Sequence, residues 1–158
     1  MRVMCVDTSA CGSMDAMNKT ITLHTDGGAR GNPGPAGAGA VVYDERGTTI
    51  KEGSKYLGHA TNNFAEYAAV VLGLEMIAKH FGKAQCKHID VIVKMDSELV
   101  CKQLNGEYQI KEPSLFPLFI QIHNLRVSTF PRVSFAHVPR AENKHADRLA
   151  NEAMDKAT

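Results

Sequence analysis

Residues 20–25 alternate apolar and polar side chains with a period of two, which is typical of a β-strand. The alternation places the carboxyl group of Asp26 at the end of one face of this strand. The segment GGARGNPGP follows, and it matches no spaced phosphate-binding fingerprint. Because the next apolar run begins at Ala38, the pattern favours a hairpin with a broad turn over a crossover into a helix.

Two more runs with strand character lie at residues 39–44 and 49–57, separated by the turn sequence DERG. Together with the first strand they predict an antiparallel meander of three strands. Residues 63–81 change to helical spacing, and a Thr-Asn pair precedes them as a capping region. Glu66 falls in the first turn of this predicted helix. The apolar residues that set its spacing are Phe64, Ala68, Val71, Leu72 and Ile77.

Strands and helices alternate in the second half of the chain. The near-continuous β-branched run HIDVIVKM at residues 88–95 is typical of a strand buried on both faces, and Asp96 follows it directly. The other expected elements are a short helix at 97–104, a helix within 113–125 that Pro117 restricts, a strand at 132–138, and an amphipathic helix at 141–157 with Leu149, Ala150 and Ala153 facing inward.

This order of elements predicts an α/β fold built on one five-stranded mixed sheet. Three antiparallel strands come first, and the last two strands enter through helical crossovers, so they should lie parallel to the first. Helices should cover both faces. In such sheets ligands gather at the carboxyl ends of strands near the switch in strand order, and Asp26 and Asp96 both lie at such ends.

The chain of 158 residues fits one globular domain at residues 19–158, preceded by a loose extension at 1–18 without sustained periodicity. Its formal net charge of +1 says little about partners, and a nucleic-acid binder would have to gather its bases locally. No segment approaches the ~20 apolar residues that span a bilayer. The four cysteines show no C-x-x-C pair, so neither a zinc site nor a disulfide scaffold is indicated. We expect a cytoplasmic monomer that uses no membrane and no small-molecule cofactor.

Four acidic residues from distant parts of the chain, Asp26, Glu66, Asp96 and Asp147, can all point toward one end of the predicted sheet. Four carboxylates in one cavity would repel one another by several kcal/mol unless cations occupy it. Since no histidine or thiolate pair accompanies them, Mg²⁺ or Mn²⁺ is favoured over zinc or copper. Two such ions could clamp a scissile phosphate, which indicates phosphodiester hydrolysis. Taken singly, each acid is more often a solvated surface residue, so the inference depends on their joint placement.

Four segments carry these acids: TDGGARGNPGPAGAGAVV, TNNFAEYAAVVLGL, MDSELV and HVPRAENKHADRLANEAM. In order and spacing they resemble the signature segments of type 1 ribonuclease H, over about Ile21 to Met154. The family fold is the five-stranded mixed sheet with helices. The resemblance implies endonucleolytic hydrolysis of the RNA strand of RNA–DNA hybrids, with two Mg²⁺ ions or Mn²⁺ as a substitute, leaving 5′-phosphate and 3′-hydroxyl ends.

The resemblance also assigns roles to individual residues. Asp26, Glu66, Asp96 and Asp147 match the family's catalytic metal-binding acids. His137, ten residues before Asp147, matches the mobile histidine that assists product release or proton transfer. The alternative for His137 is a structural role at the end of its strand.

Substrate contacts are implied at a second set of positions. Asn32, Asn62 and Asn63 match residues that touch the RNA backbone and its 2′-hydroxyls, Thr61 matches a DNA-phosphate contact, and Gly27 opens the glycine loop beside the scissile site. Amide side chains can read a 2′-hydroxyl as both donor and acceptor. Turn and helix-cap chemistry is the alternative for the polar residues, and both roles can belong to one residue.

The chain departs from some relatives in two ways. The segment between Asp96 and the fifth strand is short, so a form without the basic, tryptophan-bearing protrusion is expected, and no hybrid-binding domain is evident before Ile21. Two other functions stay open: another metal-dependent nuclease or integrase-type enzyme of the same fold, and a non-catalytic hybrid-binding module. The four intact acids argue against the module, because a binder gains nothing from a repulsive cluster.

Overall fold

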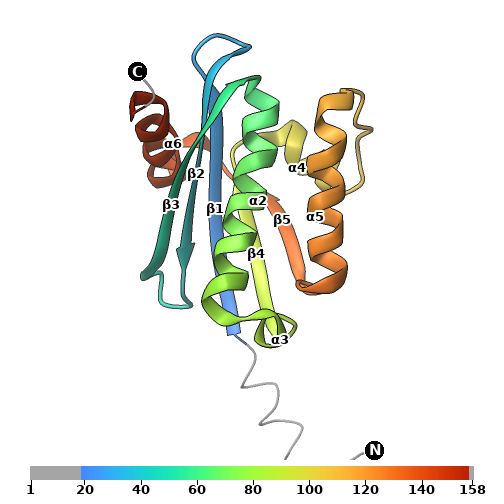
Figure 1. Cartoon of the computed structure of the whole chain (residues 1–158). Helices are drawn as coiled ribbons and strands as arrows, with labels where there is room; N and C mark the ends of the chain where they lie inside the picture. Colours follow the sequence, from blue (N-terminus) through green and yellow to red (C-terminus); the bar gives the residue numbers. More distant parts are fainter. Residues whose placement is uncertain (1–18, 157–158) are drawn as a thin grey trace, which may run out of the picture.

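Five strands form one mixed sheet in the order β3-β2-β1-β4-β5 (Figure 1). The structure is a computed structural model in which residues 19–156 are described, so the expected extension at 1–18 lies outside them. The strands are β1 (Lys19–Ala29), β2 (Gly34–Tyr43), β3 (Thr49–Ala60), β4 (Ile89–Met95) and β5 (Val133–His137). The pairs β1–β2 and β2–β3 are antiparallel, whereas β4 runs parallel to β1 and β5 parallel to β4. The predicted fold class is confirmed.

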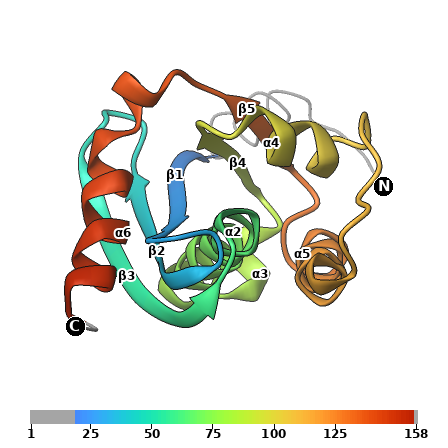
Figure 2. The same ribbon diagram turned by 90° about the horizontal axis from the view of Figure 1, so that it is seen from above.

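Helices cover both faces of the sheet (Figure 2). On one face α2 (Asn62–Phe81) packs against the sheet with α5 (Phe116–Ser128) beside it, and on the other α6 (Lys144–Lys156) lies across β1, β2 and β3. The shorter elements are α3 (Lys83–Cys86), α4 (Glu98–Leu104), η1 (Pro113–Leu115) and η2 (Arg140–Glu142). Within residues 19–156, no helix is both long enough and apolar enough to cross a bilayer.

Strand β2 lies between two packed layers, and its side chains alternate between them. Ala40 joins the larger core with α2, whereas its neighbour Val41 packs with Ala146 and Leu149 of α6. Gly39 lies on the α6 side, where a Cβ would come within 2.3 Å of the Ala146 carbonyl oxygen. The backbone of α6 therefore rests directly on β2, and only glycine fits at that contact.

Strand β1 is longer than predicted. It continues to Ala29 because its antiparallel pairing with β2 reaches that residue. The parallel pairing with β4 stops earlier, at the pair Thr25 and Met95. Asp26 therefore lies inside β1 rather than at its end, at the point where β1 and β4 separate.

Strand β4 is not buried on both faces as the continuous apolar run predicted. Its residues alternate between buried and half-buried, and the half-buried ones are Asp90, Ile92 and Lys94. The reason is the position of α6, which packs over β1, β2 and β3 and leaves the corresponding face of β4 without a main covering helix.

Helix α2 begins one residue before the predicted start. The Thr61 hydroxyl caps it by accepting the Phe64 N–H at 3.2 Å. Glu66 is therefore the fifth helical residue and lies beyond the first turn, so its predicted place in the first turn was wrong. The expected apolar stripe is also only partly right, since Phe64 is half-buried. Small residues let the other side approach the sheet: a Cβ at Gly73 would lie 2.5 Å from Leu23.

The later elements agree with the sequence pattern apart from their bounds. Ser97 caps α4, and Pro117 is the second residue of α5. A short η2 helix replaces the predicted start of the last helix, which begins at Lys144. The predicted inward residues of that helix, Leu149, Ala150 and Ala153, are buried.

Gly39→Ala should lower the free energy of unfolding by about 3 kcal/mol, because the new methyl group forces α6 away from β2. Urea unfolding followed by circular dichroism measures this change. Gly28→Ala is the matched control, since a Cβ there meets nothing closer than 3.8 Å. Equal urea midpoints for the two variants would contradict the close contact.

Candidate active site

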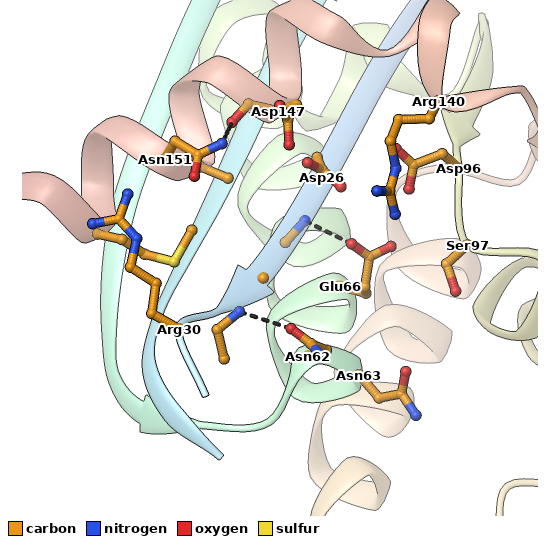
Figure 3. A pocket seen from close by; sticks show the side chains of 15 residues that line it. Asp26, Arg30, Asn62, Asn63, Glu66, Asp96, Ser97, Arg140, Asp147 and Asn151 are labelled. Carbon is orange, nitrogen blue, oxygen red and sulfur yellow. Dashed lines mark hydrogen bonds between the residues drawn. The ribbon is translucent and has the colours of Figure 1, made fainter. Parts of the chain in front are cut away.

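Three carboxyl groups meet where β1 and β4 separate (Figure 3). Asp26 comes from β1, Glu66 from α2 and Asp96 directly after β4, and one carboxylate oxygen of each lies within 4.8 Å of the others. Asp147, in the first turn of α6, lines the same cavity and points toward Asp26. The structure thus brings together the four acids that the sequence predicted to converge.

The acids line an open cavity of about 430 Å³. Asp26 and Glu66 are each 7% exposed, whereas Asp96 and Asp147 are half-buried. The cavity walls also carry Gly28, Asn62, Asn63, Ser97, Arg140 and Asn151. Two acids therefore lie deep in the protein and two lie nearer to solvent.

Gly27 sets the position of Glu66. Its N–H donates to Glu66 Oε1 at 2.7 Å. A Cβ on Gly27 would lie 2.2 Å from the Ala65 carbonyl group, so the backbone of α2 can approach β1 only because this residue is glycine. The close approach carries the Glu66 carboxylate to Asp26.

Mutual burial perturbs the two deep acids. Burial, followed by the charges of Glu66 and Asp96, raises the pKa of Asp26 to about 10. Burial also raises the pKa of Glu66, to about 7, against the opposing effects of the Gly27 N–H and a hydrogen bond with Asp26. That bond opposes the rise at Glu66, whereas hydrogen bonds with Asp147 and Glu66 add to the rise at Asp26, so the pKa of Asp26 is raised further than that of Glu66.

The chemistry of these donors suits a hard divalent cation. Within residues 19–156, the cluster of Asp26, Glu66 and Asp96 offers carboxylate oxygens and includes no histidine or cysteine. Such all-oxygen sets fit Mg²⁺, Mn²⁺ or Ca²⁺ better than zinc or copper. A cation would replace the proton on Asp26 and offset the repulsion among the carboxylates.

The predicted substrate-binding residues make local structural hydrogen bonds. Asn62 Oδ1 accepts the Ala29 N–H at 2.8 Å, and Asn32 Oδ1 accepts the Asn62 N–H at 2.9 Å. Thr61 caps α2. These bonds connect the β1–β2 hairpin to the start of α2. The side-chain oxygens of Asn32, Asn62 and Thr61 therefore have the turn and cap roles given above as the alternative.

Their positions relative to the cavity differ. Gly27, Asn62 and Asn63 line it, whereas Asn32 and Thr61 do not. His137 is exposed at the end of β5, opposite Met95 in the pairing with β4, and it also lies outside the cavity wall. The structure therefore places His137 at the same edge of the sheet as the acids without bringing it among them.

Sequence reasoning overlooked Arg140 and Asn143, which lie between His137 and Asp147. Arg140 lines the cavity close enough to oppose the rise in the pKa of Glu66, and it forms no ion pair within 4 Å among the described residues. Asn143 is buried and donates to Asp96 Oδ2 at 3.3 Å. The available signal was a base and an amide shortly before an acid in HVPRAENKHAD.

Comparisons with known proteins agree with this geometry. A model of the family described as "Reverse transcriptase-like" matches residues 24–153, which include all four acids. A bifunctional protein of Mycobacterium tuberculosis (strain ATCC 25618 / H37Rv) is 44% identical over 138 residues, or 87% of this chain and 36% of that protein. Ribonuclease HI of Halobacterium salinarum is 43% identical over 137 residues, or 87% of this chain and 65% of that protein. The chain thus spans only 36% of the length of the mycobacterial relative.

Two ribonuclease H1 structures are similar to this chain over nearly their whole length. LC11-RNase H1 in complex with RNA/DNA hybrid has a TM-score of 0.83 and 47% identity, covering 87% of this chain and 98% of that one. RNase H1 from the archaeon Halobacterium salinarum has a TM-score of 0.77 and 41% identity, and the match covers 87% of this chain and 98% of that one.

Asp26→Asn should stabilise the metal-free protein, and the gain should grow with pH. The folded pKa of about 10 lies above the ordinary 3.8, so the stability that depends on protonated Asp26 is complete at low pH and is lost as the pH rises toward 10. Asn suffers no such loss. We expect no gain at pH 4 and a gain on the order of 2 kcal/mol at pH 8 in EDTA, measured by urea unfolding.

Asp90→Asn, at the opposite end of β4, is the control for this experiment. Its carboxylate pairs with Arg132 at 2.7 Å rather than with other acids, so this variant removes a charge without relieving repulsion in the cluster. A pH dependence of Asp26→Asn equal to that of the control would show that Asp26 is not perturbed by the cluster.

Proposed function

This chain belongs to the ribonuclease H family, and we propose that it is an endoribonuclease that hydrolyses the RNA strand of RNA–DNA hybrids, leaving 5′-phosphate and 3′-hydroxyl ends. The observation that carries the proposal is the convergence of Asp26, Glu66 and Asp96, with Asp147 beside them, in one open cavity. The 47% identity to a ribonuclease H1 in complex with RNA/DNA hybrid supports the choice of substrate. We further propose that the protein acts as a cytoplasmic monomer without a small-molecule cofactor.

The four acids would hold the metal, two Mg²⁺ ions with Mn²⁺ as a substitute. Bound there, the ions would activate water and stabilise the leaving oxygen of a phosphodiester. Asp26 would hold the cations in its ionised form, and the Gly27 N–H keeps Glu66 Oε1 oriented. Repulsion among the crowded carboxylates costs free energy, and a bound cation would offset that cost. The crowding therefore favours cation binding.

Arg140 supplies positive charge at the wall of an otherwise acidic cavity. The other arginine of the wall, Arg30, is paired with Asp155 at 2.6 Å. Arg140 has no such ion pair with any residue that the structure describes, so its planar guanidinium is available to a backbone phosphate beside the scissile one. We assign it this contact.

Asn62 and Asn63 would recognise RNA from the floor of the cavity. The Asn62 oxygen is occupied by the Ala29 N–H, which leaves its amide nitrogen to donate to a 2′-hydroxyl. Asn32 and Thr61 would support this contact by fixing the loop, and Thr61 would also meet a DNA phosphate. His137 lies at the exposed edge of the sheet, where it can act on leaving product rather than on the reacting phosphate.

Asp96→Asn should reduce hydrolysis of a labelled RNA–DNA hybrid by about 10³-fold or more in Mg²⁺, because a ligand oxygen and a charge are lost. The measurement is single-turnover cleavage against a panel of hybrid, duplex DNA, single-stranded RNA and duplex RNA, each with a chelator control. Asp90→Asn, in the strand β4 that precedes Asp96, should keep the parental rate. Preferred cleavage of duplex DNA by the parent would favour an integrase-type enzyme, and Mg²⁺-independent binding without cleavage would favour a hybrid-binding module.

Arg140→Ala should raise the KM for hybrid about tenfold, since a phosphate contact is lost, with a smaller change in kcat. His137→Ala should instead lower kcat severalfold and leave KM nearly unchanged. Steady-state kinetics separates the two, with Arg148→Ala as control because Arg148 pairs with Glu152 on the exposed side of α6. An unchanged KM in Arg140→Ala would remove the phosphate assignment, and an unchanged kcat in His137→Ala would leave His137 a structural role.

A further inference from the structure

Asn143 joins η2 to α6, and its side chain is 1% exposed although it is fully polar. The amide nitrogen donates to the Thr25 carbonyl oxygen at 2.9 Å and to Asp96 Oδ2 at 3.3 Å. The amide oxygen lies 3.2 Å from His24 Nδ1. Both amide hydrogens are thus used, and the oxygen accepts from the His24 ring.

These partners are all next to residues of the acidic cluster. Thr25 directly precedes Asp26, and Asp96 is itself one of the acids. The Asn143 carbonyl oxygen also accepts the Asp147 N–H at 3.1 Å, which fixes the first turn of α6. One buried residue therefore connects the backbone beside Asp26, the carboxylate of Asp96 and the helix that carries Asp147.

The hydrogen bond to Asp96 restrains a carboxylate that is only half-buried. Because Oδ2 receives the Asn143 donor, rotation of the carboxylate is limited. The groups that hold a metal ligand in place commonly change metal affinity 10–100-fold when they are removed.

The His24 ring that contacts Asn143 is itself held by further side-chain contacts. The ring of His24 packs edge-on against Tyr43, with centroids 5.1 Å apart. The Tyr43 hydroxyl lies 3.0 Å from His145 Nδ1, and His145 Nε2 lies 2.8 Å from Glu52 Oε2. Because an amide oxygen can only accept a hydrogen bond, the contact with Asn143 requires the hydrogen of His24 on Nδ1.

We propose that Asn143 is a positioning residue that holds Asp96 and the start of α6 in the arrangement that binds divalent metal. It acts through the acids and contacts neither substrate nor product. The link to catalysis rests on the proposed function, whereas the link to metal binding does not, because it can be measured without nucleic acid.

Asn143→Ser is the informative variant. Serine is a good residue for the start of a helix and keeps the backbone carbonyl that accepts the Asp147 N–H, but its shorter side chain cannot reach Thr25 and Asp96 together. We expect Mn²⁺ binding, measured by titration calorimetry without hybrid, to weaken 10–100-fold. Far-UV circular dichroism establishes that the variant is folded, and Asn143→Ala repeats the measurement without the hydroxyl.

Asn105→Ala is the matched control. Its amide nitrogen also joins a helix end to a strand, donating to the Phe135 carbonyl oxygen at 3.3 Å, but Asn105 does not line the acidic cavity. Mn²⁺ affinity should change less than twofold in this variant, on the scale set by the outer-shell effect. Unchanged Mn²⁺ affinity in folded Asn143→Ser, or equal weakening in Asn105→Ala, would overturn the proposal.

Kinetics with hybrid gives a second readout. In Asn143→Ser, the kcat at limiting Mn²⁺ should fall at least about tenfold and recover at saturating Mn²⁺, while the KM for hybrid stays within about threefold. A loss that saturating Mn²⁺ does not restore would contradict positioning through the metal ligands. If the parent binds Mn²⁺ but cleaves no hybrid, the proposed function fails, and the calorimetry alone still decides the role of Asn143.

Discussion

The crowding of carboxyl groups in a partly buried cavity is the constraint on which the site depends. Asp26 and Glu66 are almost fully buried beside each other, and the cost of charging both appears as the raised pKa of Asp26. A protein without a cation at this place would gain stability by replacing one acid with a neutral residue. Retaining both acids is consistent with a site whose charge is completed by metal and by a polyanionic substrate.

Glycines make the crowding geometrically achievable. Gly27 admits the backbone of α2 to β1, and Gly39 admits α6 to β2, so the helices that carry Glu66 and Asp147 lie directly on the strands. Larger residues at these places would push the helices outward and separate the carboxylates. The bare segment after Asp26 therefore serves close packing as much as access for a ligand.

The end of the chain contributes more to the site than a single acid. The segment from β5 to α6 brings the cation Arg140 to the cavity wall, the buried amide Asn143 to Asp96, and Asp147 to the mouth of the cavity. Because these residues lie on η2, a connecting residue and the first turn of α6, small shifts of the helix would move all three together. The polar contacts of His24 and Tyr43 restrain that movement from the other side.

The sequence by itself determined the order of elements, the mixed sheet and the four acids, because periodicity and signature segments are local properties of the chain. It misplaced the end of β1 and the burial of β4, because the register with β2 and the position of α6 are set by partners distant in sequence. Only the tertiary structure showed that Asp26 and Glu66 are buried side by side, with a raised pKa for each, and that Asn143 donates to Asp96. Those properties arise from burial and hydrogen bonds between residues up to 119 positions apart, as His24 and Asn143 are, and no local pattern encodes such distances.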